Sequence, residues 1–295
     1  MFRGSYTALV TPFKNGAFDR KTFEKQIEFQ ARNGTNGIVP VGTTGESPTL
    51  SHEEHHLVIE VAVQAAKGTG MKVIAGTGSN ATDEALDLTR YAKRAGADGV
   101  LQVIPYYNKP TQEGMFRHFK AIADAVDIPM ILYNIPGRTG VSMTVATMGR
   151  LAGACPSIVA MKDAAGDVNI TSEIVGATKL TVLSGDDAMV VPMMSVGAVG
   201  VISVASNIIP KEMRQLVDAG LANNFAAARE IHHRYLQLFK TLFVETNPIG
   251  VKTAMELLGR DSGELRLPMC EASSANRLVI RQALINAGLM AEGRA

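Results

Sequence analysis

The stretch Ile158-Val159-Ala160-Met161-Lys162-Asp163 places a lysine directly after four apolar residues. A short apolar run of this kind is typical of a strand buried on both faces of a parallel sheet. An exposed lysine has a pKa near about 10.4, so only about one molecule in a few thousand carries the free amine at neutral pH. Burial disfavours the ammonium, and a shift of roughly three pKa units, costing about 4 kcal/mol, makes the amine nucleophilic. Lys162 is therefore a candidate Schiff-base lysine.

The same lysine has a second interpretation. At the end of a strand its ammonium can reach solvent or pair with Asp163, while its methylene stem packs on apolar neighbours. The stretch alone does not separate the two interpretations, so the position of Lys162 relative to the other predicted strands and motifs is needed.

Apolar runs and amphipathic helical patterns alternate along the chain, as expected for repeated βα units with a parallel sheet. Strands are predicted at 6–10, 37–41, 73–76, 99–104, 130–133, 158–162, 181–184 and 200–204. Helices are expected over 19–34 and from 83 through 93, the latter closing at Gly96, and Ser51 with Glu54 forms a capping-box pattern for another. Eight units in about 220 residues predict an α/β fold of the (β/α)8 TIM-barrel type.

The alternation stops after Leu221. Helical patterns follow near 225–244, 249–258 and 271–287, with no further strand and no low-complexity linker. We therefore divide the chain into a barrel over residues 1–222, which holds the active site, and a C-terminal three-helix extension over residues 223–295.

Active sites of such barrels lie where strands end and βα loops begin. Lys162 is the only lysine that the predicted strands place at such an end, since Lys72 and Lys179 precede strands. The second strand leads into GTTGES at 42–47, whose backbone N–H groups and hydroxyls can hold a small carboxylate. The motif lacks the GK[ST] ending of a nucleotide P-loop. A plain structural turn is the alternative interpretation.

Two further strands end in residues that suit the same chemistry. The fourth strand leads into PYYN at 105–108 and the fifth into YNIPGR at 133–138. Tyr133 can relay protons and Arg138 can bind a carboxylate with two parallel hydrogen bonds. Each alone is weak evidence, because a rim tyrosine often packs and an arginine is often a solvated charge. Their convergence with Lys162 at one face of the barrel favours a catalytic site.

The composition argues against several other classes of protein. Lys and Arg number 29 and Asp and Glu 28 in 295 residues, 46% of which are hydrophobic, and the basic residues are scattered. We therefore expect neither nucleic-acid nor membrane binding. Residues 188–205 carry no charge, but Pro192, Gly197 and Gly200 divide them into a helix and a short strand. Two isolated cysteines and an opening without a secretion-signal pattern favour the cytoplasm.

Two motifs resemble sites that the context does not support. HEEHH at 52–56 fits the HExxH pattern of zinc proteases, but it lies at the start of a capped helix without an evident third ligand, so no metal is expected. GTGSNA at 76–81 fits the dinucleotide pattern, but it follows the third of eight strands, and Asp98 is poorly placed to bind a ribose. We therefore expect no NAD site.

Four motifs together resemble the dihydrodipicolinate synthase family over essentially the full length. They are GTTGES at 42–47, PYYNKP at 105–110, YNIPGRTG at 133–140 and MKDAAGD at 161–167. The resemblance implies a lyase of diaminopimelate and L-lysine biosynthesis. Such an enzyme condenses pyruvate with L-aspartate 4-semialdehyde to 4-hydroxy-tetrahydrodipicolinate. It implies no cofactor, because the covalent imine with Lys162 is the electron sink.

The resemblance also implies roles for individual residues. Lys162 would form the imine with pyruvate, and Thr43 and Thr44 would hold the pyruvate carboxylate. Tyr133 would move protons through Thr44 to Tyr107, which would reach in from a neighbouring subunit. A homotetramer, built as a dimer of dimers, is therefore implied.

The second substrate distinguishes the family from its relatives. Arg138 would bind the semialdehyde carboxylate, and backbone at Gly185 and Ile202 would line the site. N-acetylneuraminate lyase and the 2-keto-3-deoxy sugar acid aldolases are similar in their lysine and tyrosine, but they generally lack this arginine. Another imine-forming aldolase of this kind, and a non-catalytic barrel that binds a small carboxylate for regulation, are the alternative hypotheses.

Many bacterial members of the family have a feedback site for L-lysine at a subunit interface. The matching positions here are Ser47, Pro48, His52, His55, Asn80, Glu84 and Tyr106. Glu84 would pair with the ammonium of the effector, while Asn80 and Tyr106 would bond its carboxylate. Pro48 departs from the alanine expected at its position.

Overall fold

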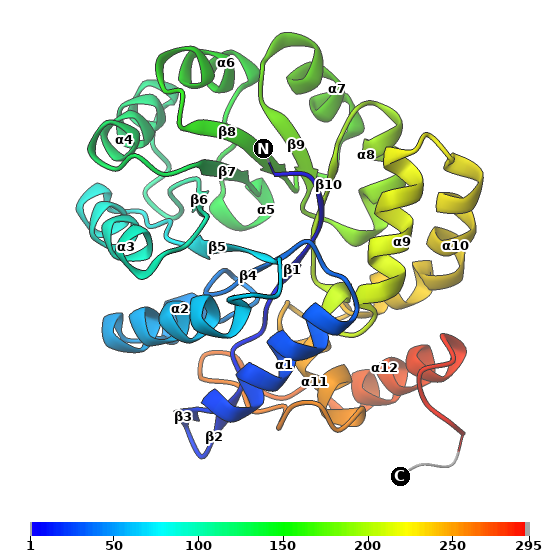
Figure 1. Cartoon of the computed structure of the whole chain (residues 1–295). Coiled ribbons are helices and arrows are strands. Elements are labelled where there is room, and N and C mark those ends of the chain that lie inside the picture. Colours follow the sequence, from blue (N-terminus) through cyan, green and yellow to red (C-terminus); the bar gives the residue numbers. More distant parts are fainter. Residues whose placement is uncertain (1, 293–295) are drawn as a thin grey trace.

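Eight parallel strands close into a barrel in the computed structural model, which describes residues 2–292 (Figure 1). The strands are β1 (Gly4–Ala8), β4 (Gly37–Val39), β5 (Lys72–Gly76), β6 (Gly99–Val103), β7 (Met130–Asn134), β8 (Ile158–Asp163), β9 (Thr181–Ser184) and β10 (Gly200–Ser203). Each pairs with the next along the chain, and β10 returns to β1. The predicted (β/α)8 barrel is confirmed, with strand ends at most two residues from those expected.

Helices surround the barrel and follow its strands in turn (Figure 1). They are α1 (Arg20–Arg32), α2 (His52–Ala66), α3 (Thr82–Ala95), α4 (Gln112–Ala125), α6 (Val145–Ala154), α7 (Val168–Ala177), α8 (Val190–Ser195) and α9 (Pro210–Leu221). The capping box of Ser51 and Glu54 at the start of α2 is confirmed. Gly96 ends α3 with a φ of 93°, a conformation that glycine adopts without a steric penalty.

Short elements lie in the βα loops above the strands. They are η1 (Ser47–Thr49), α5 (Pro136–Thr139), η2 (Asp187–Met189) and η3 (Ala205–Asn207), after β4, β7, β9 and β10. A hairpin of β2 (Phe13–Lys14) and β3 (Ala17–Phe18) precedes α1 and was not predicted. Asn15 and Gly16 form its turn with φ values of 54° and 79°, the conformation that an Asn-Gly pair favours in tight hairpins.

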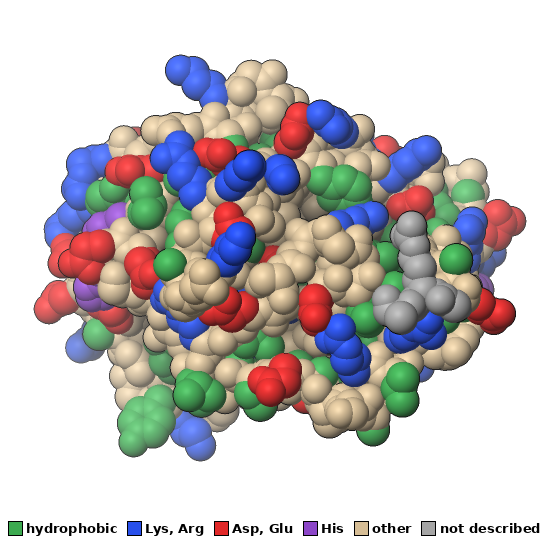
Figure 2. Space-filling view, turned by 90° about the horizontal axis from the view of Figure 1, so that it is seen from below, with side chains coloured by type: hydrophobic (Ala, Val, Ile, Leu, Met, Phe, Trp, Pro, Cys, Tyr) green, Lys and Arg blue, Asp and Glu red, His purple; other side chains and the backbone are tan. Residues whose placement is uncertain are grey.

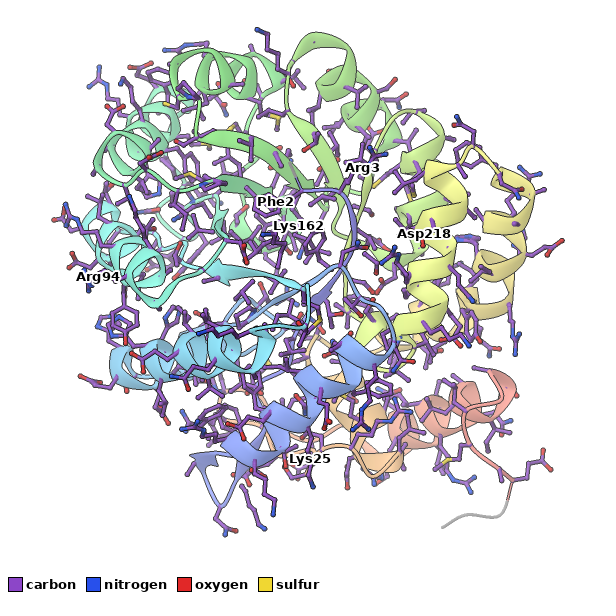
Figure 3. All side chains as sticks on the ribbon, viewed as in Figure 1. Phe2, Arg3, Lys25, Arg94, Lys162 and Asp218 are labelled. Carbon is purple, nitrogen blue, oxygen red and sulfur yellow. The ribbon has the colours of Figure 1, made fainter. Side chains whose placement is uncertain are left out.

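The barrel interior is filled by its own apolar cluster, separate from the larger one between strands and helices. Ala160 of β8 and Ile131 of β7 belong to the interior cluster, while Met161 packs toward the helices. Phe2 also belongs to it, near the centre of the ring in Figure 3. Because side chains alternate along a strand, Lys162 must point inward, as Ala160 does.

Within residues 2–292, three helices follow the barrel. They are α10 (Phe225–Thr241), α11 (Ile249–Leu257) and α12 (Ser274–Asn286). α10 lies along α9, and α11 and α12 lie below the barrel in Figure 1. Residue 1 and residues 293–295, which the sequence assigned to the barrel and the extension, lie outside the described residues.

The uncharged segment at 188–205 forms α8 and β10 within the barrel. None of the helices over residues 2–292 has the length and apolarity needed to cross a bilayer. On the face seen in Figure 2, acidic and basic side chains are interspersed, in line with the scattered charges of the sequence.

Candidate active site

Lys162 projects from the C-terminal end of β8 into the barrel, near the centre of the ring in Figure 3. The residue is 6% exposed. Burial lowers the pKa of its amine to about 7; the charge of Asp187 opposes this shift and that of Arg138 adds to it. A large fraction of the amine is therefore unprotonated near neutral pH.

Asp163 has partners of its own. Its Oδ1 accepts a hydrogen bond from the backbone N–H of Ala165, and its Oδ2 accepts one from the hydroxyl of Thr171, each at 3.2 Å. These contacts and the burial of Lys162 argue against the interpretation of Lys162 as a solvated or Asp163-paired lysine.

Tyr133 lies opposite Lys162 in the paired strands β7 and β8. The Nζ of Lys162 is 4.1 Å from the centre of the tyrosine ring. Burial raises the pKa of Tyr133 to about 12, although the charge of Arg138 and the hydroxyl of Thr43 act in the opposite direction. The phenol is therefore protonated at neutral pH and lies beside the amine, where it can pass a proton.

The turn at 42–47 forms the rim beside these residues. Val41 just before it has a φ of 50°, and Glu46 within it has a φ of 53°. Positive φ is rare for a β-branched residue, and such strain is typical of functional sites. The N–H groups of Gly45 and Ser47 both donate to the carbonyl of Gly42, which closes the turn.

Thr44 of this turn is buried and contacts a residue that the sequence analysis missed. Its Oγ1 accepts a hydrogen bond from the Nδ2 of Asn247 at 2.9 Å. The carbonyl oxygen of Asn247 in turn accepts from the Nη2 of Arg138 at 3.0 Å. Asn247 lies between α10 and α11, 203 residues from Thr44, where no motif drew attention to it.

One cavity of about 450 Å³ joins the predicted residues. Its lining includes Thr43, Thr44, Tyr133, Arg138, Lys162, Gly185 and Asn247. A Cβ atom on Gly185 would lie 3.1 Å from the Cε of Lys162 and 2.7 Å from the Cβ of Ala164, so glycine leaves room for the lysine.

Two residues named by the resemblance do not line this cavity, and for Tyr107 this agrees with its expected role in a neighbouring subunit, which stays a prediction. Ile202 is buried in the interior cluster and does not line the cavity, whereas Val204 does. Tyr107 is 89% exposed and does not line the cavity of its own chain. Its φ of 70° is a left-handed backbone conformation that is rare for a residue with a side chain.

Six of the seven positions matched to an effector site line the same cavity, and the seventh, Asn80, contacts one of them. Ser47, Pro48, His52, His55, Glu84 and Tyr106 line it. Asn80 donates from Nδ2 to the carbonyl of Tyr106 at 3.3 Å. Glu84 Oε1 is 2.9 Å from the Nε2 of His52. Pro48 lies in the first turn of η1, where proline costs no helical hydrogen bond.

The HEEHH motif at 52–56 and the GTGSNA motif at 76–81 have structural explanations. His52 contacts Glu84, and His56 stacks on Tyr91 with ring centres 3.5 Å apart. Across residues 2–292 no three His, Cys, Asp or Glu side chains are grouped to hold a metal ion. A Cβ on Gly76 would lie 2.4 Å from the carbonyl oxygen of Val41, so this glycine allows neighbouring loops to pack.

The lowered pKa of Lys162 predicts how the rate depends on pH. The kcat/KM for pyruvate should rise as pH increases through about 7, because only the free amine attacks the ketone. Asp187→Asn removes a negative charge that raises this pKa, so its profile should move to lower pH. Initial rates from pH 5.5 to 9.5 test both statements. A midpoint near the value of an exposed lysine would contradict them.

A buried amine of lowered pKa, beside a buried phenol at the carboxyl end of a (β/α)8 barrel, defines the class of lysine-dependent aldolases. Within that class, the chain belongs to the dihydrodipicolinate synthetase family, whose model matches residues 1–287.

Three relatives illustrate the similarity. The chain is 54% identical to a 4-hydroxy-tetrahydrodipicolinate synthase of Endomicrobium trichonymphae, over 98% of this chain and all of the relative. A dihydrodipicolinate synthase of Acinetobacter baumannii, solved in complex with pyruvate, is 45% identical with a TM-score of 0.96, over 98% of this chain and all of that one. That of Cyanidioschyzon merolae, solved with lysine bound, is 45% identical with a TM-score of 0.95, over 98% and 99%.

Proposed function

We propose that this protein condenses pyruvate with L-aspartate 4-semialdehyde to 4-hydroxy-tetrahydrodipicolinate, a step of L-lysine biosynthesis through diaminopimelate. The observation that supports it most is the placement of Lys162, Tyr133 and Arg138 in one cavity with the turn at 42–47. An amine, a proton relay and two sites for carboxylates are what a condensation of a keto acid with an amino-acid aldehyde requires.

The proposed reaction starts with attack of the Lys162 amine on the ketone carbon of pyruvate, and loss of water gives the imine. Loss of a methyl proton converts the protonated imine into an enamine, whose carbon attacks the aldehyde of the second substrate. The amine of that substrate then displaces Lys162 and closes the ring. The lysine is regenerated, so we propose that no cofactor is needed.

The other site residues bind substrates and move protons. Thr43 and Thr44 offer hydroxyls to the carboxylate of pyruvate, and the phenol of Tyr133 exchanges protons beside the imine. Arg138 lines the same cavity and is held by the carbonyl oxygen of Asn247, with further N–H groups left to bind the semialdehyde carboxylate.

The choice of second substrate tests this function. With pyruvate present, L-aspartate 4-semialdehyde should be consumed, whereas sugar-derived aldehydes should not. Arg138→Ala should raise the KM for the semialdehyde about a hundredfold, because a charge-assisted pair with its carboxylate is lost, and should leave the pyruvate imine in place. The control is Arg94→Ala, because Arg94 lies on the outer surface of α3, away from the cavity (Figure 3). This variant should keep the native KM. Turnover of a sugar acid instead would support the alternative aldolase.

We also propose a homotetramer built as a dimer of dimers. Tyr107 is exposed and has a positive φ on its own chain, and it would complete the proton relay of a neighbouring copy. The free cysteines Cys155 and Cys270 suit a reducing compartment, and we propose that the enzyme acts in the cytoplasm.

L-Lysine is the proposed feedback effector at the positions around Glu84. Its ammonium would replace His52 as the partner of Glu84, and Tyr106, which lines the same cavity, would bond its carboxylate. Millimolar L-lysine should lower the initial rate, and Glu84→Gln should weaken the inhibition about tenfold by removing the charge. D-Lysine at equal concentration controls for ionic strength. An unchanged rate with L-lysine would contradict the proposed effector site.

A further inference from the structure

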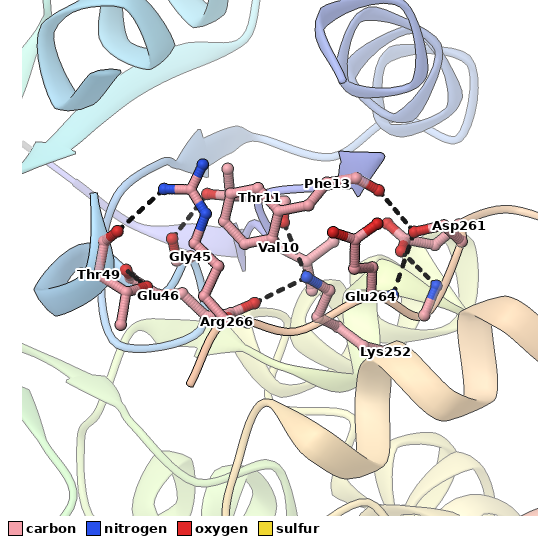
Figure 4. Close-up of polar contacts among 12 residues, drawn as sticks. Val10, Thr11, Phe13, Gly45, Glu46, Thr49, Lys252, Asp261, Glu264 and Arg266 are labelled. Carbon is pink, nitrogen blue, oxygen red and sulfur yellow. Dashed lines mark hydrogen bonds and ion pairs between the residues drawn. The ribbon is translucent and has the colours of Figure 1, made fainter. Parts of the chain in front are cut away.

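Residues that follow the barrel in sequence hold the turn at 42–47 through hydrogen bonds. The segment from Asn247 to Arg266, which follows α10, contacts Thr44 and Glu46 of this turn. Figure 4 shows the contacts around Lys252 and Glu46. Asn247 reaches Thr44, Lys252 reaches Glu46, and the backbone N–H of Arg266 donates to the second carboxylate oxygen of Glu46. The loop that presents both substrate-facing threonines therefore rests on residues that are more than 200 positions away in sequence.

Lys252 is the centre of this attachment. Its Nζ donates to Glu46 Oε1 at 2.7 Å and to the carbonyl oxygen of Thr11 at 2.9 Å. It also lies 4.5 Å from the centre of the Phe13 ring. The side chains of Lys252 and Glu46 are 0% and 2% exposed. Both charges are thus removed from water and satisfied by fixed partners.

The hydrogen bonds around Lys252 form a closed path through the turn. The hydroxyl of Thr11 donates to the carbonyl oxygen of Gly45 at 2.7 Å, directly before Glu46. Glu46 has the left-handed φ of 53°, which a residue with a Cβ atom holds only when its surroundings impose it. Lys252 therefore fixes the backbone at the point where the turn reverses direction.

Asn247 influences the direction in which the hydroxyl group of Thr44 donates its hydrogen. A hydroxyl has one hydrogen to donate and two lone pairs to accept with. Because the Thr44 oxygen already accepts from Nδ2 of Asn247, the Thr44 hydrogen is not needed for this contact. Thr44 lines the cavity, where a carboxylate or the relay needs a donor, so this hydrogen is available to it.

We propose that Asn247 and Lys252 are positioning residues of the active site: Asn247 sets the direction in which the Thr44 hydroxyl donates, and Lys252 fixes the turn through Glu46. This inference rests on the proposed function, since it concerns how the same cavity binds pyruvate. A buried ion pair gives little net stability over apolar residues of similar shape, so a role in fixing geometry is a reason for its presence.

The Asn247 part is tested with two variants of different polarity. Asn247→Asp keeps the shape but can only accept, so it should turn the Thr44 hydrogen away from the cavity and weaken pyruvate binding about tenfold. Asn247→Ala leaves the hydroxyl free to rotate and should weaken it only about threefold. Pyruvate affinity is measured as the concentration dependence of borohydride trapping of the imine. A merely structural side chain predicts the opposite order, with alanine the worse replacement.

The charge that Asn247→Asp introduces also repels pyruvate directly, so a third variant separates the two effects. In a Thr44→Val background there is no hydroxyl to turn, and Asn247→Asp should then have little further effect. A tenfold loss that persists in this background would overturn the role assigned to Asn247.

The Lys252 part is tested with Lys252→Met and with the double variant Glu46→Gln/Lys252→Met. Removing one partner of a buried pair can unfold a protein, whereas removing both charges is tolerated far better. The double variant should keep the thermal midpoint close to native and still raise the KM for pyruvate about tenfold, because the turn loses its anchor. Arg277→Met breaks the Arg277–Glu256 ion pair of the same extension and should not change this KM.

The outcomes separate the two proposals. If native protein forms no imine with pyruvate, the proposed function is wrong. If native protein forms the imine, but the Asn247 variants and the double variant bind pyruvate as native does, only the positioning role is wrong.

Discussion

Lys162→Ala is expected to lower kcat/KM at least about a thousandfold, equivalent to about 4 kcal/mol of transition-state stabilisation. The variant has no amine to form the imine, so pyruvate has no electron sink and its methyl group keeps its proton. The fold should persist, because burial of this amine is itself unfavourable to the charged form, as its lowered pKa indicates. Steady-state rates with both substrates and circular dichroism measure the two effects.

A second lysine of the barrel provides the matched control. Lys72 begins β5 at the opposite end of the barrel and pairs with Asp98 at the surface. Lys72→Ala should retain the native rate. A Lys162→Ala protein that keeps more than about a tenth of native activity would contradict the imine mechanism.

Tyr133→Phe is expected to lower kcat by about a hundredfold to a thousandfold, the usual contribution of a positioned proton donor or acceptor. The phenyl ring keeps the contact with Lys162, so pyruvate should still form its imine, but the proton transfers that follow should be slow. Rapid-quench trapping of the imine, compared with steady-state turnover, distinguishes these steps.

Tyr6 is a suitable comparison for Tyr133. It belongs to the same interior cluster, and burial likewise raises its pKa to about 12, but it does not line the cavity. Tyr6→Phe should therefore leave turnover within about twofold of native. Equal losses in the two variants would mean that the hydroxyl of Tyr133 acts on packing rather than on protons.

Local sequence patterns predicted those features that local physics determines. The apolar run before Lys162 specified a buried strand, and the lysine at its end is buried as that interpretation requires. The capping box at Ser51 and the glycine at 96 marked helix ends for the same reason. The hairpin at residues 13–18 also had its Asn-Gly signal, but its strands are too short to show a pattern.

Contacts between distant segments could not be predicted in this way. Asn247 and Lys252 have no pattern around them, and only the folded chain brings them to Thr44 and Glu46. Sequence patterns assigned Glu46 no role beyond its place in the GTTGES motif at 42–47. In the structure its buried carboxylate accepts hydrogen bonds from Lys252 and Arg266. Periodicity reports which face of an element is buried, and it does not report which element lies against that face.

The site residues likewise divide into those that local patterns could place and those that depend on distant or partner contacts. Lys162, Tyr133, Thr44 and Arg138 lie at strand ends or in the loops after them, and all four line the cavity as expected. Tyr107 lies in such a loop too, yet its side chain points to solvent. Its expected role in a neighbouring subunit came from the family resemblance, because the pattern of one chain does not reveal a contact with a second.

The most direct test of the central claim is the intact mass of the protein after borohydride treatment with pyruvate, on the native chain and on Lys162→Ala. The account predicts one reduced pyruvate adduct on each native chain and none on the variant. Absence of an adduct on native protein, or an equal adduct on both proteins, would contradict the assignment of Lys162 as the imine-forming residue.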